Sequence, residues 1–573
     1  MLRPNWTWPG AVDGRCAREL AAALGLPPAI GELLVRRGHD SLGRARAFLE
    51  PSLDELHDPF LLRDMDVAVE RIERAIEAGE PIVVYGDYDV DGITATALLV
   101  RYLRWRNAEV GYYIPHRIED GYGISSEGLE ALAARGTRLV VTCDCGITAV
   151  REVVRANAAG LDVIVTDHHE PGDTLPPAVA VLNPKREDAG YPDRGLAAVG
   201  VAFKLCEALE TAVGRGRKTV RGALDLVALG TIADLVPMTG ENRILVRYGL
   251  ERLGRTRNAG LRALLERTEL GGAAPTAWQV GFVLAPRINA IGRMESAERG
   301  VELLLTDDPI EAERIAGQFE EVNTDRKQAD RRLLAEALRL VERSYDPDEH
   351  RAIVLAGRDW HPGVIGIVAS RVVERFHRPT IVISLDEDGG GRGSARSVSG
   401  FHLLEALTAC RSHLDGYGGH RYAAGLAIRH ASVDPFREAF QAYARETLRD
   451  DQLVPALTID LEVPLTAIDG AFFSALGRFA PYGPGNPEPV LAIGGLCSRG
   501  YPRIVGEDHL KMTVAAEGRT LDSIGFNLGH LLREVDMNRG TLSITCRLRE
   551  NAYLGRSTLQ ARLIDVRTGD GRD

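Results

Sequence analysis

The sequence has no long apolar segment and few cysteines. No run of 18 uncharged apolar residues occurs, so we expect no membrane-spanning helix. The stretch MLRPNWTWPGAVDGRC at the start lacks the apolar core of a secretory signal. The 7 cysteines are scattered without a C-x-x-C pair, which argues against a disulfide framework. These absences favour a reducing, cytoplasmic environment.

The net charge of −12 is unevenly distributed along the chain. Residues 51–91 carry twelve acidic and three basic side chains, whereas residues 499–567 carry eleven basic and eight acidic ones. An acidic region could hold divalent metals while a later region binds a polyanion, so the overall charge does not exclude a nucleic-acid substrate. With 573 residues, of which 45% are hydrophobic and 26% charged, the chain is expected to be a soluble protein of several domains.

Short β-branched runs alternate with helical stretches in the first third of the sequence. Strands are predicted at residues 81–86, 110–115, 138–143 and 161–167. Strands buried on both faces and separated by helices are typical of a parallel, doubly wound α/β sheet.

The rest of the chain predicts three other kinds of structure. Residues 196–345 are helical in pattern, and the proline-free stretch after Pro309 predicts one long helix. Two apolar runs, at 352–357 and 379–384, flank a helical segment and predict a second, smaller α/β domain. The short strands that follow, separated by Gly and Pro turns, predict a β-barrel of the OB type. The expected divisions are an N-terminal segment (1–50), the α/β domain (51–245), a helical region with a long interdomain helix (246–348), the smaller α/β domain (349–452) and the barrel (453–573).

Carboxylates and imidazoles follow three of the predicted strands. Asp87, Asp89 and Asp91 come directly after the first, in GDYDVDG, and such crowding is unfavourable unless a cation neutralises it. Taken alone, this run is equally consistent with a solvated Asp-rich turn. An EF-hand is excluded, because no Glu stands at the required position and strands flank the run.

The later strands favour a metal site. Asp144 follows the third strand, and Asp167, His168 and His169 follow the fourth, all at the carboxyl edge where α/β sheets bind ligands. Asp234 follows an apolar helical run and is a further candidate ligand. Carboxylates with one or two histidines suit Mn²⁺ or Mg²⁺, whereas a thiolate-rich site would indicate zinc. Cys145 is therefore interpreted as a small packing residue.

The order of these motifs resembles the DHH phosphoesterases. DYDVDG, DCG, DHH and GTIADLVP match the family's motifs in sequence, and further segments are similar to the RecJ group within it: FVLAPRINAIGRM, WHPGVIGIVASR, GSARSVSGFHLLEAL, GGHRYAAG and PYGPGNPEP. GGHRYAAG marks a DHHA1 domain. The resemblance covers roughly residues 50–565. It implies a single-stranded-DNA-specific exonuclease that degrades DNA 5′→3′ to mononucleotides in recombination and repair, with single-strand-binding protein and a RecQ-type helicase as partners.

The resemblance also implies roles for individual residues in a site of two cations. Asp89 would serve one ion and Asp91, His168 and Asp234 the other, with Asp144 bridging them. Asp87 would be a ligand or lie beside one. His169 would face the phosphate or support the ligands, and Asp167 would orient a histidine.

Substrate-binding residues are expected on two other segments. Ser394 and Arg396 follow the flexible run 389–391, and His420 lies in a similar glycine-rich stretch, so all three are candidate phosphate ligands. Arg287, Asn289 and Arg293 on a helical segment are further candidates. The alternatives are a surface turn for the glycine run, a structural role for His420 and a helix-surface ion pair for the arginines.

Three other functions remain open from the sequence. A nanoRNase or another small-nucleotide phosphodiesterase of the superfamily usually lacks the linker helix and the barrel. A non-catalytic scaffold would have lost ligands, whereas every ligand position here is filled. An aminoacyl-tRNA editing hydrolase would explain the DHHA1 motif but not the DHH motifs.

Overall fold

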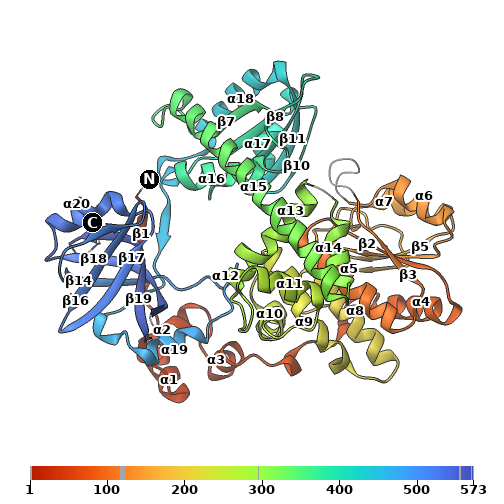
Figure 1. Cartoon of the computed structure of the whole chain (residues 1–573), viewed down its shortest axis with the longest axis horizontal. Helices are drawn as coiled ribbons and strands as arrows, with labels where there is room; N and C mark the ends of the chain where they lie inside the picture. Colours follow the sequence, from red (N-terminus) through yellow and green to blue (C-terminus); the bar gives the residue numbers. More distant parts are fainter. Residues whose placement is uncertain (1–2, 116–122, 295, 554–555, 570, 572–573) are drawn as a thin grey trace. The chain divides into compact units, whose positions relative to one another are not determined.

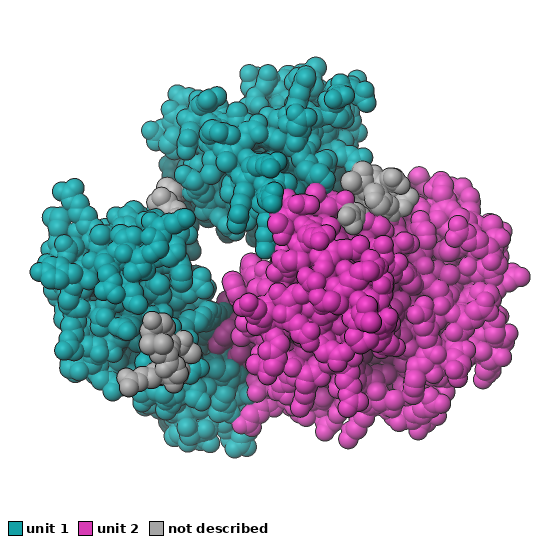
Figure 2. Space-filling model, in the orientation of Figure 1, with its two compact units in different colours: residues 1–49, 327–479, 488–573 teal, residues 50–326, 480–487 magenta. Residues whose placement is uncertain are grey.

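The computed structural model describes residues 3–115, 123–294, 296–553, 556–569 and 571. The chain forms two compact units, which Figure 2 shows in different colours. Unit 1 comprises residues 1–49, 327–479 and 488–573, and unit 2 comprises residues 50–326 and 480–487. No helix in the described part of the chain is long and apolar enough to cross a membrane.

A five-stranded parallel sheet is the centre of unit 2 (Figure 1). Its order is β3-β2-β4-β5-β6, where the strands are β2 (Ile82–Gly86), β3 (Val110–Tyr113), β4 (Leu139–Cys143), β5 (Asp162–Thr166) and β6 (Ala180–Leu182). The first four lie within the predicted segments, and β6 is an addition. Alternate strand residues enter different cores, with Val141 in one and Val140 in the other, so both faces are covered. The predicted doubly wound α/β fold is confirmed.

Helices complete unit 2. Those that follow strands are α5 (Val90–Trp105), α6 (Ser126–Ala134) and α7 (Val150–Ala158), and α4 (Met65–Ala78) precedes the sheet. The helical region contains α8 (Ala198–Ala212), α9 (Leu224–Ala233), α10 (Gly240–Leu253), α11 (Ala259–Arg267), α12 (Ala277–Gln279), the π-helix η4 (Val280–Leu284), α13 (Ala285–Met294) and α14 (Glu298–Leu305). The predicted long helix is α15 (Pro309–Ser344), which begins in unit 2 and ends in unit 1.

The smaller α/β part of unit 1 has a mixed sheet of order β10-β11-β9-β8-β7. Its elements are β7 (Ile353–Arg358), α16 (Ile365–Phe376), β8 (Thr380–Leu385), β9 (Gly390–Arg396), α17 (Leu403–Ala409), β10 (Gly416–Gly419), β11 (Ala423–Arg429) and α18 (Val433–Thr447). The glycine run at residues 389–391, which was expected to be flexible, is mostly part of a strand in the structure. Gly390 and Gly391 begin the central strand β9, paired with β8 and β11.

The seven-stranded C-terminal sheet has the order β13-β14-β18-β19-β17-β16-β15, with an additional β14–β16 pairing that curls it into the expected barrel. Its strands are β13 (Leu461–Glu462), β14 (Leu491–Ser498), β15 (Arg503–Val505), β16 (His509–Ala516), β17 (Arg519–Gly525), β18 (Leu542–Tyr553) and β19 (Arg556–Thr568). The N-terminal segment packs here too. β1 (Asn5–Thr7) pairs with β12 (Ala456–Thr458), and the Trp6 indole donates to Asp565 at 2.8 Å.

Candidate metal centre

Three neighbouring strands of the unit 2 sheet end at the same edge, and each is followed by an acidic residue. The amide of Asp87 donates to the carbonyl of Cys143, and the amide of Asp144 donates to that of Thr166, both at 3.1 Å. The interstrand hydrogen bonds therefore continue one residue past β2 and β4 and bring these aspartates together. Asp144 has a φ of 66°, a left-handed conformation that aspartate tolerates better than most residues.

The start of α5 fixes two further carboxylates. Asp89 caps this helix by accepting from the amides of Asp91 at 2.9 Å and Gly92 at 3.1 Å. Asp91 points the other way, and its two oxygens accept from the amides of Ala198 and Val199 at 2.8 and 2.9 Å, at the beginning of α8. The N-terminal end of α8 thus holds the Asp91 carboxylate in one orientation.

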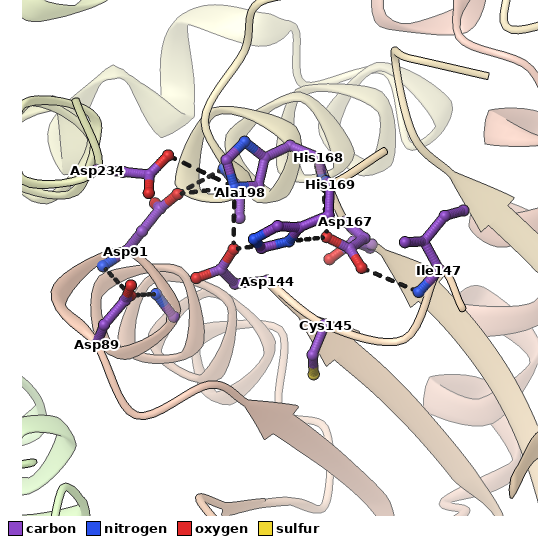
Figure 3. Close-up of polar contacts among 12 residues, drawn as sticks. Asp89, Asp91, Asp144, Cys145, Ile147, Asp167, His168, His169, Ala198 and Asp234 are labelled. Atoms are coloured by element: carbon purple, nitrogen blue, oxygen red, sulfur yellow. Dashed lines mark hydrogen bonds and ion pairs between the residues drawn. The ribbon is translucent and has the colours of Figure 1, made fainter. Parts of the chain in front are cut away.

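His168 lies at the middle of the cluster (Figure 3). Its Nε2 is 3.1 Å from Asp144 Oδ1, 3.5 Å from Asp234 Oδ2 and 3.9 Å from Asp91 Oδ2. Asp234 reaches this point from the C-terminal end of α9, where it is the capping residue. The motifs that are separate in the sequence are therefore brought together in space.

Asp167 holds the second histidine. Its Oδ1 lies 2.8 Å from His169 Nδ1 and also accepts from the amides of His168 and His169, while Oδ2 accepts from Ile147 at 2.9 Å. The His169 ring lies 3.8 Å from Asp144 Oδ1. Asp167 thus orients His169, as expected. Cys145 is 1% exposed and packs in the adjoining core.

Three sets of side chains have ligand atoms close enough together to hold an ion: Asp87, Asp89 and Asp144; Asp91, His168 and Asp234; and Asp144, His168 and His169. Their ligand atoms lie within 4.8 Å of one another in each set. Asp144 belongs to the first set and, through its 3.1 Å approach to His168, adjoins the second. In the described part of the chain, the buried atoms Asp144 Oδ1 and His168 Nε2 make no hydrogen bond. Buried oxygen and imidazole atoms without such partners fit divalent cations.

The pKa values of these side chains also fit a site for cations. Burial, together with repulsion from the neighbouring carboxylates, raises the pKa of Asp91 to about 7 and that of Asp234 to about 8. The same causes raise the pKa of Asp144 well above its usual range. Burial lowers the pKa of His168 to about 3, so this imidazole is neutral, the form that binds metal. Burial also opposes the charge on His169, but Asp167 outweighs it and the pKa of His169 is raised.

The expected phosphate ligands lie on elements of both units. Arg287, Asn289 and Arg293 are on α13 in unit 2, where Gly292 lies so close to the Tyr88 carbonyl that a Cβ would approach it to 2.7 Å. Arg287 forms an ion pair with Glu320 of α15, at 2.5 Å between Nε and Oε2, and donates to the Val283 carbonyl. Arg287 thus makes the ion pair that the sequence left open as an alternative, and its role as a phosphate ligand stays a prediction.

Ser394, Arg396 and His420 belong to unit 1 and so to a different unit from the metal cluster. Ser394 and Arg396 share one side of β9, and Arg396 Nη1 donates to Ser394 Oγ at 3.0 Å. Near the start of α16, a Cβ on Gly366 would come within 2.9 Å of Ser394 Oγ and 3.0 Å of Arg396 Nη2. His420, just beyond β10, is exposed.

The structure adds one element to the surroundings of the site. Residues 480–487 belong to unit 2 and pack on the segment that follows Asp234. The Met238 amide donates to the Pro484 carbonyl at 2.6 Å, and Arg243 donates to the Pro481 carbonyl at 3.2 Å. The sequence singled out this motif, PYGPGNPEP, but contained no signal of where it packs.

Comparisons with known proteins agree with these observations. The model of the DHH family N-terminal domain matches residues 81–231, that of the DHHA1 domain residues 349–446 and that of the RecJ OB domain residues 459–565. The single-stranded-DNA-specific exonuclease RecJ of Dickeya dadantii is 39% identical over 93% of this chain and 95% of its own length. The protein of the same name from Bacillus subtilis is 40% identical over 90% of this chain, which spans 65% of that relative.

Solved structures give the same assignment. RecJ from Thermus thermophilus in complex with Mn²⁺ matches 99% of this chain and 80% of its own, with a TM-score of 0.85 and 33% identity. The Mg²⁺ complex of that protein matches with a TM-score of 0.78 and 31% identity over 99% of this chain and 79% of its own. The shared domains, the likeness over nearly the whole chain and the buried Asp and His cluster lead to one conclusion: the chain belongs to the RecJ family of DHH phosphoesterases, a group of metal-dependent nucleases.

Proposed function

We propose that this chain degrades single-stranded DNA from the 5′ end to mononucleotides by hydrolysis that depends on Mn²⁺ or Mg²⁺. The observation that carries the proposal is the buried cluster around His168, whose carboxylates and imidazoles come from three adjacent strand ends and two helix ends. The barrel at residues 459–565 favours a long strand as substrate over a small nucleotide, because it matches a RecJ OB domain.

We assign the ligands as two groups that share one carboxylate. Asp87 and Asp89 would hold one ion, Asp91, His168 and Asp234 the other, and Asp144 would contribute to both. Two cations held by these residues would supply activation of the attacking water and stabilisation of the charge that develops on the phosphate. Asp91 keeps its orientation through the amides of α8, so this carboxylate needs no rearrangement during the reaction.

The protein's other contribution near the metals comes from His169. Asp167 holds its Nδ1 at 2.8 Å and raises its pKa, which favours the protonated ring. We assign the Nε2 hydrogen of His169 to a phosphate oxygen of the substrate. This charge-assisted donor would stabilise the phosphate without taking part in metal binding.

The polarity of degradation requires a group that recognises the 5′ end. Ser394 and Arg396 converge near the start of α16, a 12-residue helix, and Gly366 keeps the space beside them open. A hydroxyl, a guanidinium and a helix N-terminus together are suited to a terminal phosphate. We assign these residues, with His420, to the 5′-phosphate, and Asn289 and Arg293 to phosphates of the strand.

The test is digestion of strands labelled at either end. With Mn²⁺, a 5′ label should appear at once in mononucleotide, whereas a 3′ label should pass through progressively shorter fragments. The same strand in a blunt duplex should be resistant. Release of a 3′-labelled mononucleotide at the start would refute the polarity, and cleavage confined to dinucleotides would favour a small-nucleotide phosphodiesterase.

The setting implied by this function is DNA recombination and repair in the cytoplasm. Single-strand-binding protein and a RecQ-type helicase are the proposed partners, because they bind or generate the strand that the enzyme degrades. The proposed domain boundaries are those given above for the sequence. Co-purification of either protein with the full chain tests the partners.

A further inference from the structure

Two aromatic side chains are exposed next to each other on the helix that leads into α13. Trp278 is 58% exposed and Phe282 is 67% exposed, and their ring centroids lie 5.4 Å apart at an interplanar angle of 22°. Large apolar side chains stacked in solvent are unfavourable unless something covers them. No charged residue occurs between Leu270 and Pro286, so phosphates have no counter-charge within this segment.

Three other exposed rings of the described chain are already covered by cations. Arg215 lies over Trp105 at 5.0 Å, Arg539 over Tyr501 at 4.4 Å and Arg562 over Phe526 at 5.0 Å. Trp278 and Phe282 instead stack on each other. This arrangement is suited to planar, uncharged ligands such as nucleobases.

The helix that carries the pair is anchored beside the metal centre at two points. Thr276 starts it with a capping box, and a Cβ on Gly281 would lie 3.5 Å from Ile232, two residues before Asp234. At the other end, Gly292 lies against the carbonyl of Tyr88, the residue that stands between Asp87 and Asp89 in the sequence. Both ends of the helix thus contact segments that supply metal ligands.

The local backbone is also unusual. Residues Val280–Leu284 form a π-helix, a conformation that is rare and is often found at functional sites. Val280 and Leu284 are buried, so the turn is fixed from beneath while Phe282 points to solvent. The aromatic pair therefore sits on a rigid support.

We propose that Trp278 and Phe282 form a stacking platform for unpaired bases of the DNA strand that is being degraded. The inference rests on the proposed function, because it takes single-stranded DNA as the ligand. A duplex presents its bases already stacked and paired, so the platform would favour single strands over duplexes. It reads no sequence, since every base has a π-face.

The experiment compares Trp278→Ala and Phe282→Ala with wild type on a normal strand and on a strand with consecutive abasic positions. Each variant should reduce kcat/KM on the normal strand about five- to a hundredfold, mainly through KM. On the abasic strand the variants and wild type should be equal, because no base is present to stack. On the normal strand, Phe282→Tyr should keep kcat/KM near the wild-type value, whereas Phe282→Leu should lower it as Phe282→Ala does. This comparison separates aromatic stacking from apolar bulk.

The matched control is Trp105→Ala, because Trp105 is also an exposed tryptophan of unit 2, with 52% of its surface exposed. This variant should leave kcat/KM unchanged. Wild-type kinetics for both alanine variants on the normal strand would overturn the platform and favour a protein partner for this surface. Equal losses on normal and abasic strands would also overturn it. Failure of wild type to cleave any single strand would instead refute the proposed function.

Discussion

Met238 and Pro484 are joined by a 2.6 Å hydrogen bond from the amide of the first to the carbonyl of the second. Met238 lies four residues after Asp234, and a Cβ on Gly483 would approach its Cβ to 3.1 Å. Asn242, on the same helical turn as Arg243, donates to the carbonyls of Gly195 and Pro237. Gly195 leads into α8, whose first amides bind Asp91. Residues 480–487 thus brace the two segments that position Asp91 and Asp234.

The first prediction tests this brace. Asn486 is 2% exposed, its side chain donates to the Pro481 carbonyl at 2.8 Å, and its backbone pairs with Gly483. Asn486→Ala should weaken Mn²⁺ binding about tenfold, because a buried hydrogen bond that shapes the brace is lost. Calorimetric titration of the metal-free protein measures this. The control is Asn157→Ala, which removes an exposed bond of the same kind to Pro177. A lower melting temperature with unchanged Mn²⁺ affinity would show that the brace only stabilises the fold.

The second prediction concerns pH and metal-free stability. The pKa of Asp91 is about 7 and that of Asp234 about 8, both above the usual value for aspartate. Raised carboxyl pKa values favour the folded state below about pH 4 and lose that contribution as the pH rises through about 7 to 8. The rise in melting temperature that Mn²⁺ produces should therefore be larger at about pH 8.5 than at about pH 5.5. Thermal unfolding with Mn²⁺ and with a chelator measures it, and an equal rise at both pH values would contradict the assignment.

The third prediction concerns the 5′ end. A 5′-phosphorylated strand should be cut about ten- to a hundredfold faster than a 5′-hydroxyl strand, the range expected for a charge-assisted contact. Arg396→Ala should remove most of that difference by slowing only the phosphorylated strand. Arg429→Ala is the control, since Arg429 is exposed and pairs with Asp415. Equal wild-type rates on the two strands would exclude a 5′-phosphate ligand.

The fourth prediction separates His169 from the metal ligands. Asp167→Asn should lower the pKa of His169, because the carboxylate that raises it is lost. The alkaline limb of the pH–rate profile should then move to lower pH, while the number of bound Mn²⁺ ions stays the same. An unchanged profile, or loss of an ion, would show that Asp167 acts on the metals instead.

Much of the metal centre could be predicted from the sequence, because it depends on local rules. Parallel strands end at one edge, so an acidic residue after each of β2, β4 and β5 must converge there. Asp234 was different: its place after an apolar helical run made it a candidate ligand, but nothing local places a helix C-terminus beside that edge, and its assignment to an ion came from the resemblance. In the structure, Asp234 and the residues that follow these three strands lie within one cluster.

Long-range packing was not predictable in the same way. No pattern within residues 480–487 indicates that they leave the barrel and join unit 2, and deleting the chain from residue 455 would therefore remove the brace as well. The ion pair of Arg287 depends on Glu320 of another helix, which no pattern around Arg287 in the sequence indicates. Glycines at 390 and 391 suggested flexibility, but pairing with two neighbouring strands overrides their freedom.

The most direct test of the metal assignment is Asp144→Ala, measured for Mn²⁺ stoichiometry, single-strand binding and cleavage in parallel. Asp173→Ala, an exposed aspartate beyond the same sheet edge, is the control. Wild type and the control should bind two Mn²⁺ ions and degrade the strand. Asp144→Ala should bind single strands nearly as well, lose at least one ion and show no cleavage, because the shared carboxylate is gone. Retention of a substantial fraction of wild-type turnover at saturating Mn²⁺ would contradict the two-metal centre.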